Sequence, residues 1–300
     1  MPTGRNGQRP AGNISTRGMG QMKRRNFLQA AGVIGATGSS GLAGGNAQTG
    51  ETSQPCEVIQ NQPDQKRVLV TSADSPLAQA VAAELDTAYR VRLTSSLDVP
   101  ATQPFTRSDL GHDESTNTLV RGTDAIVHVA TPPGGSERTR QIDHRTRCTY
   151  NLLMAAAEEG VQTVVYLSSL EILLGYDEDY EVTEDWKPLI SSQSVALSDY
   201  LGEFTCREFA HESRLRVVVL RLGRVVRRDE VRGKPFDPLW VEQQDVTRAI
   251  AGTLCLSLGD TELSRRRWTI LHIGSGSPDA RFTSQRAAQL IEYQPQFNWE

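Results

Sequence analysis

Cysteine is scarce in this chain, and what there is shows no metal-binding pattern. The 300 residues hold 4 cysteines, Cys56, Cys148, Cys206 and Cys255, with no CxxC pair. Their spacing excludes the usual cysteine metal sites. A disulfide is allowed if the protein is exported, but the sequence does not assign one. The last three cysteines lie in helix-like or core-like segments, where we expect them to be small buried hydrophobic side chains.

Long apolar runs and an excess of basic residues are also missing. Apart from the N-terminal region, no apolar run is long enough to span a bilayer, and 38% apolar with 23% charged residues is typical of a globular protein. Residues 1–47 contain 6 of the 32 basic residues and none of the 36 acidic ones, which leaves the rest with a net charge of −10. We therefore expect no nucleic-acid partner, because phosphate contacts need a basic surface.

The N-terminal region has the layout of an export signal. The basic segment KRRNFL (residues 23–28) precedes a mildly apolar Ala/Gly-rich run (residues 30–43), and Gly45-Asn46-Ala47 offers small residues for cleavage. This layout resembles a twin-arginine (Tat) signal peptide over residues 1–47. The alternative is an uncleaved basic tail. The resemblance implies a protein exported to the periplasm, with no stable membrane span after cleavage.

The rest of the chain alternates between apolar strands and helices. Residues 48–65 are polar and aperiodic and predict a linker. Expected strands are Arg67–Thr71, Tyr89–Thr94, Ala125–Ala130, Thr163–Ser168, Arg216–Leu222 and Thr269–Ile273. Expected helices are Leu77–Leu85, Arg138–Glu159, Ser198–Glu212, Gln244–Leu256 and Thr283–Glu292. This alternation predicts an α/β fold, a Rossmann-like doubly wound parallel sheet.

The first strand runs into a turn that has lost its glycines. The segment RVLVTSADSPLAQAVAAEL (residues 67–85) is typical of the strand, turn and helix that open a dinucleotide-binding fold. Three glycines normally permit a tight turn, close approach of a pyrophosphate and helix packing. Here Ser72, Ser75 and Ala78 take those positions. If either serine needs a left-handed backbone, its side chain costs roughly 1–2 kcal/mol.

Several further motifs follow in a fixed order along the chain. They are GTDAIVHVA (residues 122–130), TYNLLMAA (149–156), VVYLSS (164–169) and SDY (198–200). With these, residues 66–299 resemble the extended short-chain dehydrogenase/reductase family, in its NAD-dependent epimerase/dehydratase group. The resemblance implies NAD or NADP as cofactor and a sugar or sugar nucleotide as substrate. By analogy it also implies a homodimer formed through the helices at 138–159 and 198–212.

The resemblance places the cofactor on the turn and on the ends of later strands. The positions are Ser72, Ser75, Pro76, Leu77, Asp109, Leu110, Ala130 and Thr131. A serine hydroxyl and a helix N-terminus both suit a phosphate, whereas Asp74 puts negative charge nearby. The family's ribose-binding acid is missing, because Thr94-Ser95-Ser96 stand there. Arg92 lies close by, and a role for it on a 2′-phosphate stays open.

The catalytic positions depart further from the family. The resemblance implies a Ser/Thr, a Tyr and a Lys four residues after the Tyr. Tyr200 is present, but Phe204 takes the lysine position and Leu170 the hydroxyl position. Ser169 and Glu171 flank Leu170, and we take Tyr200, Ser169 and Glu171 as the catalytic candidates. Without the lysine, the tyrosine lacks the cation that lowers its pKa.

Two functions stay open at this point. One is an enzyme, ancestrally an oxidoreductase or epimerase on sugars or sugar nucleotides. The other is a non-catalytic, exported Rossmann-fold binding or structural module, in which Tyr200 is an ordinary helix tyrosine and Ser169 caps the next turn. No metal site is expected, since the acidic run at 177–181 has no ligand spacing. His128 and His144 have no catalytic partner in sequence and are interpreted as structural or exposed.

A small C-terminal lobe completes the expected fold. Its segments are residues 176–197, 227–243 and 274–299. Because these segments are short for the family, we expect a shallow or reduced substrate pocket.

Overall fold

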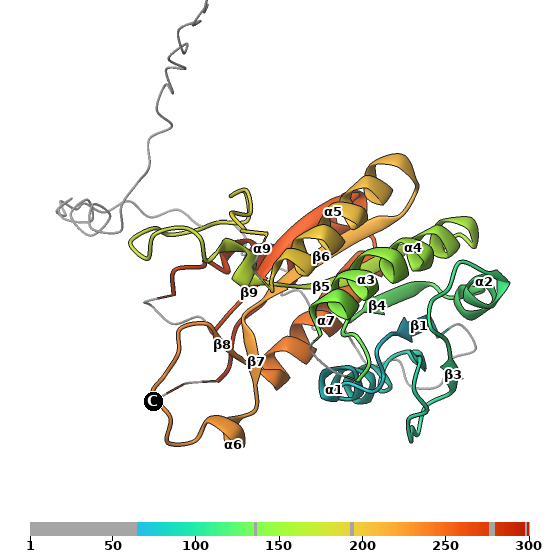
Figure 1. The fold of residues 1–300 in the computed structure, drawn as a ribbon, viewed down its shortest axis with the longest axis horizontal. Helices are drawn as coiled ribbons and strands as arrows, with labels where there is room; N and C mark the ends of the chain where they lie inside the picture. Colours follow the sequence, from blue (N-terminus) through green and yellow to red (C-terminus); the bar gives the residue numbers. More distant parts are fainter. Residues whose placement is uncertain (1–64, 135–136, 193–194, 276–279, 298, 300) are drawn as a thin grey trace, which may run out of the picture.

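The computed structural model describes residues 65–134, 137–192, 195–275, 280–297 and 299 (Figure 1). The predicted signal peptide (1–47) and all but the last residue of the predicted linker (48–65) lie outside the described residues.

A seven-stranded sheet forms the centre of the molecule, in the order β3-β2-β1-β4-β5-β6-β9. Every neighbouring pair is parallel, which confirms the predicted Rossmann-like α/β fold. The strands are β1 (Arg67–Val70), β2 (Arg90–Ser95), β3 (Phe105–Arg107), β4 (Ala125–His128), β5 (Thr163–Ser169), β6 (Arg216–Leu222) and β9 (Trp268–Ile273). The strand order reverses at β1 and β4, and such a switch point opens a crevice at the carboxyl ends of the strands.

Alternating side chains of each strand pack into two different cores. Val68 and Val70 face one hydrophobic cluster, whereas Leu69 between them faces the other. Both faces are therefore covered by helices, which explains why the strands are continuous apolar runs.

Helices cover the two faces of the sheet (Figure 1). α1 and α7 share one core, and α4 and α5 share the other. The helices are α1 (Pro76–Leu85), α2 (Glu114–Val120), α3 (Arg138–Asp143), α4 (Thr149–Glu158), α5 (Leu197–Glu212), α6 (Arg228–Val231), α7 (Gln243–Leu258), α8 (Glu262–Arg265) and α9 (Gln285–Ile291). The prediction missed β3, α2 and the short α6 and α8, which carry weak periodicity.

The helix predicted at 138–159 is not one regular helix. A π-helical turn, His144–Cys148, separates α3 from α4. Such a turn inserts one extra residue and is frequent at functional sites. The insertion changes which side chains of this segment face the crevice.

A third cluster joins segments that are distant in sequence. Val182, Phe282 and Leu239 pack with Leu170 and its neighbours, so each of the three segments expected to form the lobe contributes to it. Val182 and Phe282 also form an isolated β-bridge. β7 (Arg224–Val226) and β8 (Trp240–Glu242) form a separate two-stranded parallel sheet.

The cysteines divide into two kinds. Cys148 and Cys206 are buried free thiols, as expected. Burial raises the pKa of Cys148 to about 11 and that of Cys206 well above its usual value, so both are unreactive near neutral pH. Cys255 was wrongly predicted to be a plain buried side chain, because it takes part in a disulfide.

Candidate functional site

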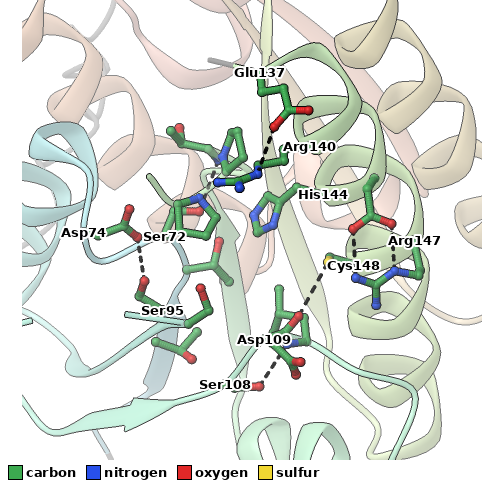
Figure 2. Close-up of a pocket in the computed structure, with 18 of the residues that line it drawn as sticks. Ser72, Asp74, Ser95, Ser108, Asp109, Glu137, Arg140, His144, Arg147 and Cys148 are labelled. Atoms are coloured by element: carbon green, nitrogen blue, oxygen red, sulfur yellow. Dashed lines mark hydrogen bonds and ion pairs between the residues drawn. The ribbon is translucent and has the colours of Figure 1, made fainter. Parts of the chain in front are cut away.

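A cavity of about 620 Å³ lies at the carboxyl ends of β1, β2 and β4 (Figure 2). We call it the β1–β4 cavity. Its walls are the turn after β1, the end of β2, the segment after β3, the loop after β4, and α3 with the π-helical turn. The lining residues used below are Ser72, Asp74, Thr94, Ser95, Ser96, Asp109, Leu110, Thr131, Glu137, Arg140, Asp143, His144, Arg147 and Cys148.

The structure brings four of the eight predicted cofactor residues to this cavity. Ser72, Asp109, Leu110 and Thr131 line it. The other four are not among its lining residues: Ser75 caps α1, Pro76 and Leu77 begin that helix, and Ala130 follows β4. The sequence therefore located the cavity, although it did not show what its side chains do there.

Ser72 adopts the left-handed backbone that a glycine would normally supply. Its φ is 58°, so the strain anticipated for this position is real and costs roughly 1–2 kcal/mol. The Ser72 hydroxyl offsets part of the cost by accepting a hydrogen bond from the Thr131 amide at 3.1 Å. The Ser72 carbonyl accepts from the Ser75 amide at 2.9 Å. Ser75 itself is extended, with φ −88°, and carries no such strain.

The start of α1 has few amide groups left for an anion. Pro76 occupies the first turn and has no N–H. The Ala78 amide donates to the Ser75 hydroxyl at 3.2 Å, and the Gln79 amide donates to the Ser75 carbonyl at 3.2 Å. Among these first helical positions, Leu77 alone keeps an N–H without an acceptor in the described structure. The anion site that a helix N-terminus usually provides is therefore reduced to one donor.

Asp74 points toward the end of β2. Its Oδ1 accepts a hydrogen bond from the Ser95 hydroxyl at 2.6 Å (Figure 2). The carboxylate thus lies beside Thr94-Ser95-Ser96, where the sequence suggested that an acidic residue was missing. Thr94 is 1% exposed, and its hydroxyl has no partner among the described residues.

Arg92 does not serve the cavity. Its Nη1 donates to the Leu119 carbonyl at 2.8 Å, and its side chain lines a different surface depression. The open suggestion that Arg92 binds a 2′-phosphate is therefore wrong, because its strand position directs it away from the β1–β4 cavity.

The segment after β3 forms the opposite wall. Leu110 is buried with a φ of 53°, and its carbonyl accepts from Asn151 Nδ2 at 2.9 Å. The Asp109 carboxylate accepts from the Gly111 amide at 3.1 Å. These bonds hold the segment so that the Asp109 carboxylate is exposed at the edge of the cavity.

Both arginines that line the cavity are already paired. Arg147 donates two bonds of 2.8 Å to Asp143, and Arg140 lies 3.1 Å from Glu137. Asp74 and Asp109 have no basic partner within 4.0 Å among the described residues, whereas every lining arginine has an acidic one. The cavity therefore presents excess negative charge.

His144 was interpreted from the sequence as structural or exposed. In the structure it lines the cavity. The π-helical turn presents it there, and its Nε2 is buried without a partner among the described residues. Burial lowers the His144 pKa to about 4, so the ring is neutral at pH 7. It adds no positive charge to the cavity.

His128 is structural, as interpreted from the sequence. It is fully buried, and its ring nitrogens lie 2.8 Å from the Thr71 hydroxyl and 2.9 Å from the Thr149 hydroxyl. Burial keeps its pKa well below the usual value. The histidine thereby ties β1 to α4 beneath the cavity.

The three catalytic candidates lie away from the cavity. Tyr200 is half-buried on α5 and packs against the cluster that contains Leu170. Ser169 accepts from the Glu171 amide at 3.1 Å and caps the following 3₁₀ turn. Glu171 pairs with Arg224 at 2.7 Å. Leu170 is 2% exposed, so a buried apolar group occupies the expected hydroxyl position.

The polar groups around Tyr200 are engaged in ion pairs. Glu203 holds Arg221 in a fully buried two-bond pair of 2.9 and 2.8 Å. Asp199 lies 2.7 Å from Arg145. Phe204 is 46% exposed, and its ring lies 5.0 Å under the Arg207 guanidinium.

Sequence reasoning missed the partner of Glu203. The available signal was Arg221 itself, a charged residue inside the apolar strand VVVLRL. A buried arginine in such a strand needs a carboxylate.

Among the described residues, no group of three or more His, Cys, Asp or Glu is placed to hold a metal ion. Within the same residues, no helix is both long and apolar enough to cross a bilayer.

Comparison with known proteins places the chain among nicotinamide-dependent relatives. The model of the NAD dependent epimerase/dehydratase family matches residues 37–269. The chain is similar to glucuronic acid dehydrogenase from Chromohalobacter salexigens, with 21% identity and a TM-score of 0.65 over 79% of this chain and 86% of that one. No curated protein matches the chain.

Two further solved structures share the fold. Uronate dehydrogenase from Agrobacterium tumefaciens has 19% identity and a TM-score of 0.63, over 78% of this chain and 85% of that one. UDP-glucuronic acid 4-epimerase from Bacillus cereus in complex with NAD has 18% identity and a TM-score of 0.60, over 77% and 92%. At such identities the likeness concerns the fold alone.

Proposed function

Because the chain belongs to the NAD dependent epimerase/dehydratase family, we propose that it keeps the family's nucleotide cavity as a binding site and has lost the hydride-transfer chemistry. The protein is then a non-catalytic ligand-binding module on an enzyme scaffold. The β1–β4 cavity is its binding site, and the surroundings of Tyr200 are structural.

The observation that carries this proposal is the environment of Tyr200. A tyrosine acid needs a cation that stabilises its phenolate and a hydroxyl that orients the substrate. Phe204 and the buried Leu170 stand at those positions. Ser169 is used as a cap and Glu171 as an ion-pair partner. The nearby charged groups on α5 are also occupied, since Asp199 pairs with Arg145 and Glu203 with Arg221.

The family cofactor fits the described turn poorly. In relatives such as the Bacillus cereus epimerase, NAD is present. In this chain the Ser72 hydroxyl, Pro76 and the Ser75 cap remove donors from the place where the pyrophosphate would lie. No step of chemistry is assigned to NAD here.

A turnover assay tests the proposal. The full chain is mixed with NAD or NADP and a panel of uronic acids, sugars and UDP-sugars, and nicotinamide absorbance and epimer formation are followed. We expect no turnover from the unaltered chain or from Tyr200→Phe. Turnover that Tyr200→Phe abolishes would overturn the proposal and favour the second candidate, an oxidoreductase or epimerase acting on sugars, for which the retained Tyr200 is the supporting observation.

The proposal also includes export to the periplasm and self-association as a homodimer. The Tat-like segment supports export to the periplasm, and fractionation of cells that express the full chain measures it. Tyr150 on α4 and Phe204 on α5 are exposed aromatic side chains, 47% and 46% accessible, on the two helices suggested for a homodimer. Sedimentation of the purified chain decides between monomer and dimer.

A further inference from the structure

The β1–β4 cavity differs from a dinucleotide site in where its carboxylate lies. In a site for NAD, an acid after the second strand binds the ribose hydroxyls. Here the acid comes from the turn, since Asp74 reaches the end of β2 and is held there by the Ser95 hydroxyl at 2.6 Å. The bond uses Oδ1, so Oδ2 is free to accept from a ligand hydroxyl.

Two residues that line this cavity also carry a buried polar atom without a partner among the described residues. The Thr94 hydroxyl and His144 Nε2 are buried without a hydrogen-bond partner among the described residues. A buried polar group without a partner is costly unless a ligand or water satisfies it. Thr94 precedes Ser95 at the end of β2, whereas His144 belongs to the π-helical turn.

The charge of the cavity argues against a polyphosphate. Arg140 and Arg147 are both neutralised by carboxylates of their own helical segment, and His144 is neutral. Asp74 and Asp109 stay uncompensated among the described residues. A pyrophosphate would therefore meet two carboxylates that form no ion pair, and among the described residues the cavity offers it no cation outside an ion pair.

We propose that the β1–β4 cavity selects a ribonucleoside with a free 2′,3′-diol and without a pyrophosphate, and that the Asp74–Ser95 pair binds the diol. The inference rests on the proposed function, because it names the ligand class of the same binding site. The Asp109 carboxylate at the opposite wall can accept from an exocyclic amino group, which favours adenosine as the probe.

Calorimetry on the full chain tests the proposal with four probes. They are adenosine, 2′-deoxyadenosine, adenosine 2′-monophosphate and NAD. We expect adenosine to bind most tightly. The deoxy compound loses one hydroxyl bond and the 2′-phosphate meets the Asp74 carboxylate, so each should bind at least about tenfold more weakly. NAD should bind no more tightly than adenosine.

Asp74→Asn tests whether the Asp74 carboxylate binds the diol. It should weaken adenosine binding about tenfold and reduce the difference between adenosine and its 2′-monophosphate. The matched control is Asp98→Asn, an exposed carboxylate paired with Arg107 outside the cavity, which should bind every probe as the unaltered chain does. If Asp74→Asn fails to fold, the four-probe order on the unaltered chain still decides.

Three results would overturn the inference: NAD binding at least about tenfold more tightly than adenosine, unchanged probe discrimination in Asp74→Asn, or no binding of any probe. The proposed function fails separately. Tight NAD binding without turnover overturns the inference alone, whereas turnover together with the adenosine preference overturns the proposed function alone.

Discussion

The β1–β4 cavity and the surroundings of Tyr200 have diverged from their relatives in different ways. The cavity is still open, and its changed residues, such as Ser72 and Asp74, make new contacts along its wall. Around Tyr200, by contrast, Leu170 is part of a core and the charged side chains are paired with one another. One region is a cavity lined by polar side chains, whereas the other is held by a hydrophobic cluster and by ion pairs.

Under the proposed function, this difference is how the scaffold kept its fold without the family's chemistry. Catalytic groups need access to the substrate and a pKa suited to the reaction. Once those groups pair with one another, they contribute to stability and specificity of packing instead. The comparison therefore predicts that changes around Tyr200 alter stability most, whereas changes in the cavity turn alter it least.

The largest effect is expected at the buried ion pair. Glu203→Gln leaves the Arg221 charge, 2% exposed, without its carboxylate, and should lower the free energy of unfolding by about 3–5 kcal/mol. Urea unfolding measures this. Replacing both partners by apolar residues (Glu203→Leu with Arg221→Met) should lower the free energy of unfolding much less than Glu203→Gln does, because no charge is left buried.

The matched control is Glu208→Gln, whose exposed pair with Arg207 should contribute at most about 1 kcal/mol. A loss at Glu203→Gln no larger than at Glu208→Gln would show that the buried pair is not structural, and the comparison would fail.

A smaller, pH-dependent effect is expected at the cavity wall. Burial lowers the His144 pKa to about 4, while the unfolded chain has the ordinary value near 6.5. Between these values the unfolded state binds more protons, so stability should fall as the pH drops from about 6.5 to 4. His128 and His272 shift in the same direction.

His144→Gln should therefore lessen the loss of unfolding free energy between pH 7 and 4.5, by up to about 2 kcal/mol. Urea unfolding at the two pH values gives the difference. The exposed His211→Gln is the control and should leave the pH dependence as it is. Equal behaviour of the two variants would contradict the burial of His144.

The smallest effects are expected in the turn after β1. Ser75→Ala removes the cap on the Ala78 amide and should cost about 1 kcal/mol of unfolding free energy. Ser72→Gly relieves the left-handed strain but loses the bond to Thr131, so the two terms should cancel to within about 0.5 kcal/mol. Chemical denaturation of the two variants measures these changes in unfolding free energy. A larger decrease for Ser72→Gly than for Ser75→Ala would contradict the prediction.

Much of the fold could be predicted from local patterns. The alternation of apolar runs with amphipathic helices located six of the seven strands of the sheet. β3 has three residues and one partly buried side chain, so it carries too little periodicity to be recognised. The helix at 138–159 was predicted as one piece, because a π-helical turn leaves no mark in composition.

The candidate site was predictable as a set of positions but not as a set of contacts. Ser72, Asp109, Leu110 and Thr131 were identified from the turn and strand ends, and all line the cavity. The roles of Asp74 and Arg92 were not identified from the sequence. The direction of a side chain depends on strand pairing and on neighbours from other segments. Asp74 was expected to place negative charge near the phosphates, but its hydrogen bond with Ser95, 21 residues away, was not predicted.

The sequence by itself determined the parallel sheet, the turn without glycines, and the apolar residues Phe204 and Leu170 at two positions where the resemblance implies polar ones. These are properties of single residues and of local periodicity. The tertiary structure alone decided that Glu203 meets Arg221, that Asp74 supplies the carboxylate at the end of β2, and that both cavity arginines are neutralised. The physical reason is that charge and hydrogen-bond pairing depend on distances of a few ångströms, many of them between residues from different elements, which only the packed chain sets.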